Sequence, residues 1–142
     1  MKKILITAMT LFVGLIFGQE SPIGFNQLPK NAQSFVNKYF GKGVVSTVIR
    51  DKEVSKIDYK VIMKDGTKIT FDGRGNWDDV ETKGYSVPAA LIPISIRNYV
   101  AQHYKGIQIV GIDKESYKYK IELSNGMDLE FNKQGKFIKI GD

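Results

Sequence analysis

The feature that most constrains the fold is an internal repeat. Residues 57–77 align without a gap with residues 117–137, and residues 28–40 align with residues 92–104, so the segments follow one another in the same order. A repeat of this kind predicts one supersecondary unit used twice, with the units at residues 25–80 and 85–140. The identical pairs in the longer block are Tyr59/Tyr119, Lys60/Lys120, Gly66/Gly126, Phe71/Phe131 and Gly75/Gly135.

Each unit is predicted to open with an amphipathic helix. In residues 28–40 the apolar side chains recur at steps of three and four, which places them on one stripe, and residues 92–104 carry the same stripe. Pro29 suits the first turn of a helix. Pro88 and Pro93 predict a short leading turn and a kink before the second helix. The expected helix terminators are Gly41, Gly43 and Gly106.

The remainder of each unit is predicted to form antiparallel strands. Residues 44–50 and 107–112 are rich in β-branched side chains, and two linked hairpins follow each of them. A three-residue loop around Gly66 pairs Val61 with Ile69 and places every large apolar side chain of that hairpin on one face, whereas a two-residue loop would divide them between two faces. The loop around the aligned Gly126 follows the same rule. Reversed parity predicts a bulge or a strand end near Val80, Ile138 and Ile140.

These elements predict an α+β fold in a single domain, residues 19–142. Each unit supplies one helix and about four strands. The two helices pack on one face of a roughly eight-stranded antiparallel sheet, and the other face is left to solvent.

The first eighteen residues are predicted to be a secretory signal peptide rather than part of the fold. Lys2 and Lys3 precede an apolar run over residues 4–17, and polar sequence begins at Gln19. The alternative, a membrane anchor, needs about 20 apolar residues. The absence of cysteine also excludes a lipid-modified cysteine after the run. The expected location is therefore periplasmic or secreted, and loss of the two lysines lowers the formal charge from +6 to +4.

Composition excludes several kinds of function. A chain with no Cys and one His has no thiolate zinc site, no Cys nucleophile and no multi-histidine metal centre. Arginine occurs only three times and no run of four basic residues exists, which disfavours nucleic-acid binding. His103 could act as a general base, but it aligns with Tyr39 on the helix stripe, so a ring packed at the edge of the core is expected. Residues 72–83 place Arg74 and Lys83 where a calcium loop needs carboxylates, which favours a hairpin turn.

The predicted outward face of the sheet is the candidate binding surface. Its first half carries Lys60 and Lys68 and leans basic, whereas its second half leans acidic. A solvated face explains this pattern, and a partner-binding surface oriented by charge is the alternative. The candidate partner-binding residues are Lys60, Ile62, Lys68, Thr70, Lys120, Glu122, Asp128 and Glu130.

Four ordered motifs resemble a known family. L-P-x-x-A-x-x-F-V-x-x-Y-F at residues 28–40 is followed by Y-x-V-x-M-x-D-G-T-x-I-x-F-D-x-x-G-x-W at residues 59–77. Further along stand V-P-x-x-L-I-P-x-x-I-x-x-Y-V at residues 87–100 and Y-x-I-E-L-S-N-G-x-x-L-E-F-N-x-x-G-x-F at residues 119–137. Together they are similar to the PepSY-like family of beta-lactamase-inhibitor-like exported proteins. The resemblance implies helices on one side of a concave sheet, and it implies neither inhibition nor any catalytic residue.

The leading hypothesis is a non-enzymatic, exported module that binds a protein or peptide, of which an inhibitor of an envelope enzyme is one form. The alternative is an envelope hydrolase or small-ligand carrier with an unrecognised site. No cofactor, metal or catalytic residue is predicted. The expected partner is an envelope or extracellular protein or peptide, not nucleic acid, and no membrane span is expected after signal removal.

The signal-peptide hypothesis is tested on the native protein. N-terminal sequencing of protein isolated from the cell envelope should begin near Gln19, because cleavage is expected at the end of the apolar run. A cytosolic species that retains Met1 would contradict it.

Overall fold

The computed structural model describes residues 19–41 and 44–141. The predicted signal peptide lies outside the described residues. The described part contains two α-helices, two short 3-10 helices and nine strands. In chain order they are β1 (Gln19–Pro22), η1 (Phe25–Gln27), α2 (Lys30–Tyr39), β2 (Val45–Lys52), β3 (Ile57–Met63), β4 (Lys68–Phe71), β5 (Trp77–Glu81), η3 (Ala89–Leu91), α3 (Ile94–His103), β6 (Ile109–Lys114), β7 (Lys118–Leu123), β8 (Asp128–Asn132) and β9 (Phe137–Ile140).

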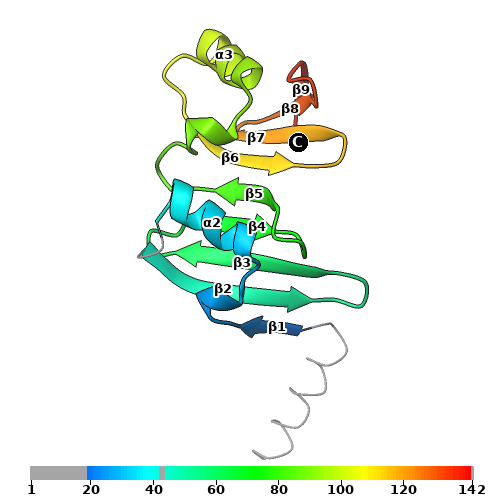
Figure 1. Cartoon of the computed structure of the whole chain (residues 1–142). Helices are drawn as coiled ribbons and strands as arrows, with labels where there is room; N and C mark the ends of the chain where they lie inside the picture. The colour runs from blue at the N-terminus through cyan, green and yellow to red at the C-terminus, as the bar shows by residue number, and fades with distance from the viewer. Residues whose placement is uncertain (1–18, 42–43, 142) are drawn as a thin grey trace, which may run out of the picture.

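The nine strands form one antiparallel sheet in which each strand pairs with its neighbours in the sequence (Figure 1). The predicted α+β class with two helices on one face is confirmed, whereas the expected number of about eight strands is one too few. The additional strand is β1, which pairs with β2 at the edge of the sheet. Its sequence, QESP, has no apolar alternation because all four residues are exposed, and its Pro22 is tolerated because an edge strand needs only one set of backbone partners.

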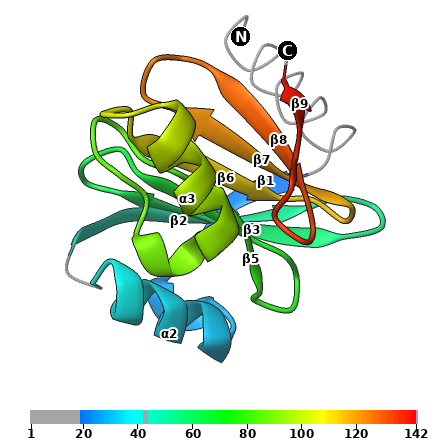
Figure 2. The ribbon, with the colours of Figure 1, turned by 90° about the horizontal axis from the view of Figure 1, so that it is seen from above.

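The two helices are shorter than their apolar stripes. The stripes predicted helices over residues 28–40 and 92–104, but each helix begins after a proline, with Pro29 and Pro93 at the N-cap positions. The leading turn predicted before the second helix is η3, and η1 precedes the first helix in the same way. Both helices lie over the same side of the sheet (Figure 2). Their buried residues are Ala32 and Val36 on α2 and Ile96 and Val100 on α3.

The three-residue hairpin loops are confirmed. In the first hairpin the Met63 amide donates to the Thr67 carbonyl at 2.8 Å and Val61 lies opposite Ile69. The Leu123 amide donates to the Met127 carbonyl at 2.8 Å in the second. The loops require glycine because Gly66 and Gly126 have φ of 93° and 89°, a region that other residues rarely adopt.

Of the two alternatives predicted from the reversed parity, a bulge or a strand end, the structure has the bulge in both places. On β5 the pairing with β4 shifts by one residue, so that Trp77 lies opposite Phe71 but Asp79 lies opposite Thr70. The shift on β9 lies between Phe137 and Lys139. Each bulge therefore keeps an aromatic ring on the helix side and then reverses the parity of the residues that follow it.

The core lies between the helices and the sheet. Phe71 and Phe131 are fully buried, at 0% exposure, and each meets an aromatic ring from a helix edge-on. Phe35 of α2 contacts Phe71 with ring centroids 5.6 Å apart, and Tyr99 of α3 contacts Phe131 at 5.3 Å. None of the helices in the described ranges is long and apolar enough to cross a membrane.

The core assignment predicts the effect of removing one ring. Phe131→Ala should lower the free energy of unfolding by about 3–5 kcal/mol, because it deletes a fully buried side chain and leaves a cavity. Tyr117→Ala, at a side chain that is 88% exposed, should change it by less than about 0.5 kcal/mol. Urea denaturation of both variants measures the difference, and equal midpoints would contradict the assignment.

Candidate functional site

The face of the sheet opposite the helices collects charged side chains from both halves of the chain. Residues directly opposite each other on paired strands share a face, and the pairings place Asp79 opposite Asp113, Lys120 opposite Glu130 and Glu122 opposite Asp128. The bulge on β5 is the reason that Asp79 lies here, because it sends Val80 into the core and its two neighbours to the open face.

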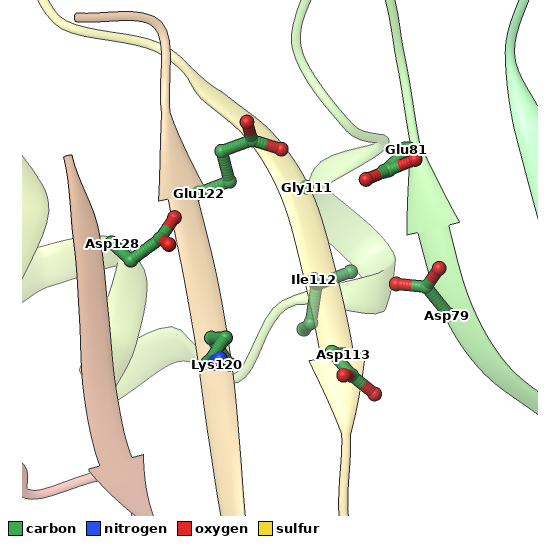
Figure 3. Close-up of a pocket in the computed structure, with 8 residues that line it drawn as sticks. All are labelled: Asp79, Glu81, Gly111, Ile112, Asp113, Lys120, Glu122 and Asp128. Atoms are coloured by element: carbon green, nitrogen blue, oxygen red, sulfur yellow. The ribbon is translucent and has the colours of Figure 1, made fainter. Parts of the chain in front are cut away.

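A shallow hollow of about 250 Å³ lies on this face over β5–β8 (Figure 3). Gly111 opens it: a Cβ atom at Gly111 would lie 3.0 Å from Glu122 Oε1 and 3.1 Å from Glu122 Cβ. Without a side chain on that residue, the carboxylates of β5 and β7 border the same space. The hollow is lined by Asp79, Glu81, Gly111, Ile112, Asp113, Lys120, Glu122 and Asp128.

Three carboxyl groups that line the hollow, Asp79, Asp113 and Glu122, have raised pKa values. Burial raises the pKa of Asp79 to about 7, and the neighbouring charges of Asp113 and Glu81 add to the effect. Burial is also the main cause of the raised pKa of Asp113 and of Glu122. Asp78, at the bulge, has its pKa raised to about 6 by burial and by the charge of Asp58. Burial and the repulsion between neighbouring carboxylates therefore both disfavour the charged form of these groups.

The ion pairs of the open face involve one carboxylate of the hollow, Glu81, which lies 3.5 Å from Lys68. Within residues 19–41 and 44–141, none of the ion pairs involves Asp79, Asp113, Glu122 or Asp128. Glu130 differs, because it is 6% exposed and accepts a 2.8 Å hydrogen bond from Lys118, which lowers the pKa of its carboxyl.

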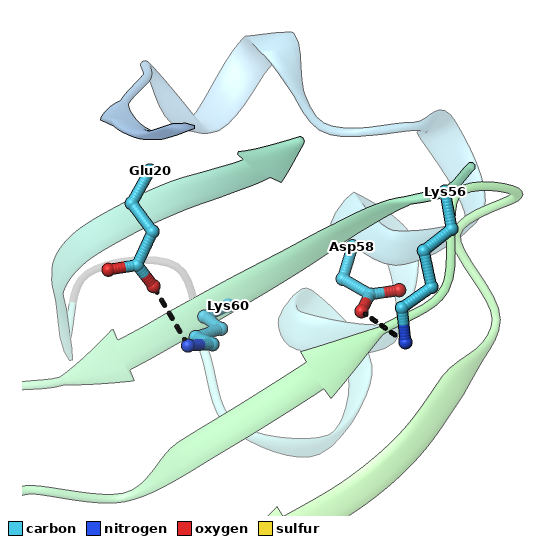
Figure 4. A network of polar contacts seen from close by, with 4 residues as sticks. All are labelled: Glu20, Lys56, Asp58 and Lys60. Carbon is cyan, nitrogen blue, oxygen red and sulfur yellow. Dashed lines mark hydrogen bonds and ion pairs between the residues drawn. The ribbon is translucent and has the colours of Figure 1, made fainter. Parts of the chain in front are cut away.

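The lysines predicted to make the first half basic are matched by carboxylates. Lys60 lies 3.0 Å from Glu20 of β1 (Figure 4), and Lys68 lies 3.5 Å from Glu81 of β5. Beside them, Thr70 faces Lys60 across the strands and Ile62 faces Lys68, both half-buried. The basic lean expected from Lys60 and Lys68 is therefore offset by two carboxylates that the sequence had not placed on this face, Glu20 of β1 and Glu81 of β5.

The structure places all eight predicted partner-binding residues on this open face, but it brings only Lys120, Glu122 and Asp128 into the hollow. Sequence reasoning missed Asp79, Glu81, Gly111 and Asp113. A signal for the first two existed, since the reversed parity at Val80 implies that its neighbours point outward. Asp113 was missed because the strand was expected to end at Ile112, whereas β6 continues to Lys114.

His103 and the acidic loop after β4 have the structural roles expected of them. The ring of His103 stacks on Tyr99 with centroids 4.0 Å apart, although the residue itself is exposed. Asp72 accepts hydrogen bonds from the amides of Arg74 and Asn76, at 2.9 and 3.0 Å, which is a turn rather than a metal loop. Across the described part of the chain, no group of three or more Asp, Glu or His side chains is placed to hold a metal ion.

The arrangement can attract and hold a cationic group. Several carboxylates border a hollow that is open to solvent, and one lysine, Lys120, stands among them. Reactions that depend on general acid–base chemistry use walls that exclude water from the reacting groups, and this shallow depression on a sheet face has no such enclosure.

Comparison with known proteins agrees with the family resemblance of the four sequence motifs. The family model described as "Putative beta-lactamase-inhibitor-like, PepSY-like" matches residues 57–139. No curated protein sequence is similar enough to count as a relative.

Three solved structures are similar over most of the chain. One, described as a putative calcium-regulated periplasmic protein from Bacteroides thetaiotaomicron, is 32% identical with a TM-score of 0.82, covering 87% of this chain and 97% of that one. A putative periplasmic protein of the DUF2874 family from Bacteroides vulgatus is 33% identical with a TM-score of 0.81, covering 87% and 98%. A second periplasmic protein of unknown function from B. vulgatus is 28% identical with a TM-score of 0.83, covering 87% and 100%. These relatives support a periplasmic location for this chain.

The raised carboxyl pKa values predict that stability falls as the pH rises. The pKa of Asp79 is about 7 in the folded protein against an ordinary value of 3.8. The folded state therefore binds more protons than the unfolded state and loses stability between about pH 4 and pH 7. Asp79→Asn should melt a few degrees higher than wild type at pH 8 and about equally at pH 4. Thermal melts of the variant and the wild type from pH 4 to pH 8 measure this. A parallel slope for Asp79→Asn would contradict the prediction.

Proposed function

Because the chain belongs to the PepSY-like family of putative beta-lactamase-inhibitor-like proteins, we propose that it is a non-enzymatic, protein-binding module of the periplasm. The partner docks on the open face of the sheet and inserts a lysine or arginine side chain into the acidic hollow. The observation that carries the proposal is that four carboxylates of the hollow form no ion pair with any residue that the structure describes, namely Asp79, Asp113, Glu122 and Asp128. An inhibitor of an envelope enzyme is the form of binding that the family description favours.

A cationic partner group supplies what the hollow lacks. Asp79 and Asp113 face each other across β5 and β6, and like charges directly opposite destabilise a sheet. An ammonium or guanidinium group between them converts that repulsion into charge-assisted hydrogen bonds. The binding free energy then includes relief of repulsion that the free protein carries, so a basic side chain is favoured over a neutral one.

The surrounding surface contributes shape and orientation. The eight candidate residues named from the sequence all lie on the open face, and those outside the hollow already form ion pairs or half-buried contacts. Such residues exclude water from the centre of an interface without adding much binding energy themselves. We therefore place the main binding energy at the hollow and an orienting role at Lys60 and Lys68, whose charges are partly matched by Glu20 and Glu81.

One similar structure is described as calcium-regulated. Calcium needs six to eight oxygen ligands at 2.3–2.6 Å, and the described residues of this chain contain no group of three carboxylate or imidazole side chains placed to hold a metal ion. The proposed occupant of the hollow is accordingly an organic cation carried by a protein.

The experiment is a comparison of matched variants. The protein is immobilised, a periplasmic extract of the native host is passed over it, and the captured protein is purified for surface plasmon resonance. Glu122→Gln, which removes one carboxylate of the hollow, should weaken binding about tenfold and reduce its dependence on salt.

Two controls separate the hollow from the rest of the molecule. Glu53→Gln makes the same chemical change at an exposed residue away from the hollow, and His103→Ala alters the helix side, so neither should change the affinity. Equal binding by Glu122→Gln and wild type at low salt would contradict the proposal, as would loss of binding in His103→Ala with an unchanged melting temperature.

A further inference from the structure

A second concave surface lies on the helix side of the sheet, away from the acidic hollow. It is a groove of about 590 Å³ between α3, the segment that leads into it, and the start of β6. This volume falls in the range of small-molecule sites in proteins. Its floor is apolar and consists of side chains with at most 8% exposure, namely Val87, Ile92, Val100 and Ile109.

Two cationic side chains line the same groove. Arg97 projects from α3 on the stripe that also carries Val100 and Tyr104, and Lys105 follows the helix. Among the described residues neither Arg97 nor Lys105 takes part in an ion pair. An apolar groove with unmatched positive charge is complementary to a molecule with an apolar body and an anionic group.

The first half of the chain shows that the charge of Arg97 is not needed for the fold. Residues 64 positions apart begin the same elements, η1 and η3, α2 and α3, and β2 and β6. At the position matching Arg97 stands Gln33, whose Nε2 donates to the Leu28 carbonyl at 2.8 Å. Arg97 makes the matching bond, from Nε to the Ile92 carbonyl at 3.1 Å. A neutral glutamine therefore satisfies this carbonyl, and the positive charge of Arg97 is additional to the structural role.

Smaller side chains than those at the matching positions of the first half leave the space in the groove. Ala89 in η3 lines the groove, whereas the matching residue of η1 is Phe25, whose ring packs against the core. Ala101 of α3 also lines it, and it matches the larger Asn37 of α2. The second half has smaller side chains at both places, and the groove is open where they stand.

From these observations we propose that the groove binds a medium- or long-chain fatty acid, with the acyl chain on the apolar floor and the carboxylate at Arg97 and Lys105. This site is separate from the open face, and a protein partner can occupy one while a fatty acid occupies the other. The proposal is therefore independent of the proposed protein-binding function.

Decanoate is the probe, and 1-decanol of the same chain length tests the need for the carboxylate. Isothermal titration calorimetry with the purified protein should show saturable binding of decanoate, and binding of decanol at least about tenfold weaker, because a hydrogen bond to a charged group is lost. Amide chemical-shift changes should map to Ala101, Gly106 and Ile109 rather than to the open face.

The variants introduce into the second half the side chains found at the matching positions of the first half. Arg97→Gln copies Gln33, keeps the bond to the Ile92 carbonyl and should weaken decanoate binding about tenfold or more, whereas Lys30→Gln, the same loss of charge on α2, should leave it unchanged. Ala89→Phe copies Phe25 and should abolish binding by filling the groove. Its fold is checked by circular dichroism, and Arg97→Gln decides the question if Ala89→Phe does not fold.

Three binding results would overturn the proposal. They are the absence of saturable decanoate binding, equal affinities for decanoate and decanol, and equal affinities of Arg97→Gln and wild type for decanoate. Shift changes confined to the open face would overturn it as well. If partner capture by the open face is lost while decanoate still binds, the fatty-acid site stands and the protein-binding function fails, so the two outcomes are distinguishable.

Discussion

The geometry of two hairpin loops determines which side chains face the helices and which face solvent. Because side chains alternate along a strand, a change of one residue in loop length would turn one strand over relative to the other and divide the apolar side chains of each hairpin between two faces. Gly66 and Gly126 adopt positive φ and allow the three-residue loop that sets the observed register. With that register Phe71 and Phe131 lie under the helices. The charged side chains that alternate with the core positions then lie on the uncovered face.

The two halves of the sheet join where β5 pairs with β6, and this seam brings carboxylates together on the uncovered face. Only three residue pairs join β5 to β6, and one of them places Asp79 against Asp113. Glu81 faces Gly111, which provides the space for its carboxylate and opens the hollow. The segment after β5 is held at both sides, since Tyr85 donates to Asp65 at 2.8 Å and the Val87 amide donates to the Ile109 carbonyl at 2.8 Å. The packing of the core and these hydrogen bonds stabilise the fold enough to offset the repulsion between Asp79 and Asp113.

The sequence was sufficient for the parts of the fold that repeat a pattern. The helices and both hairpin registers were predicted, because the spacing of the apolar residues and the positions of the glycines specify them locally. β1 was missed because a polar edge strand has no apolar pattern to detect. The acidic hollow was missed because it forms from four strands that meet only in the folded sheet, and the pairing of β5 with β6 depends on a segment of irregular structure. That the two halves arose by duplication remains a prediction.

Matched positions that differ between the halves are the most informative places to look for function in such a chain. Where both halves use the same kind of residue, as with Phe71 and Phe131, the shared scaffold explains the choice. Gln33 and Arg97 make the same bond to a carbonyl before their helices, so only the charge differs, and the fold does not account for it. The same reasoning applies to Phe25 and Ala89. Matched positions that differ can therefore give the two halves different surfaces, while the positions that match supply the stability needed for folding.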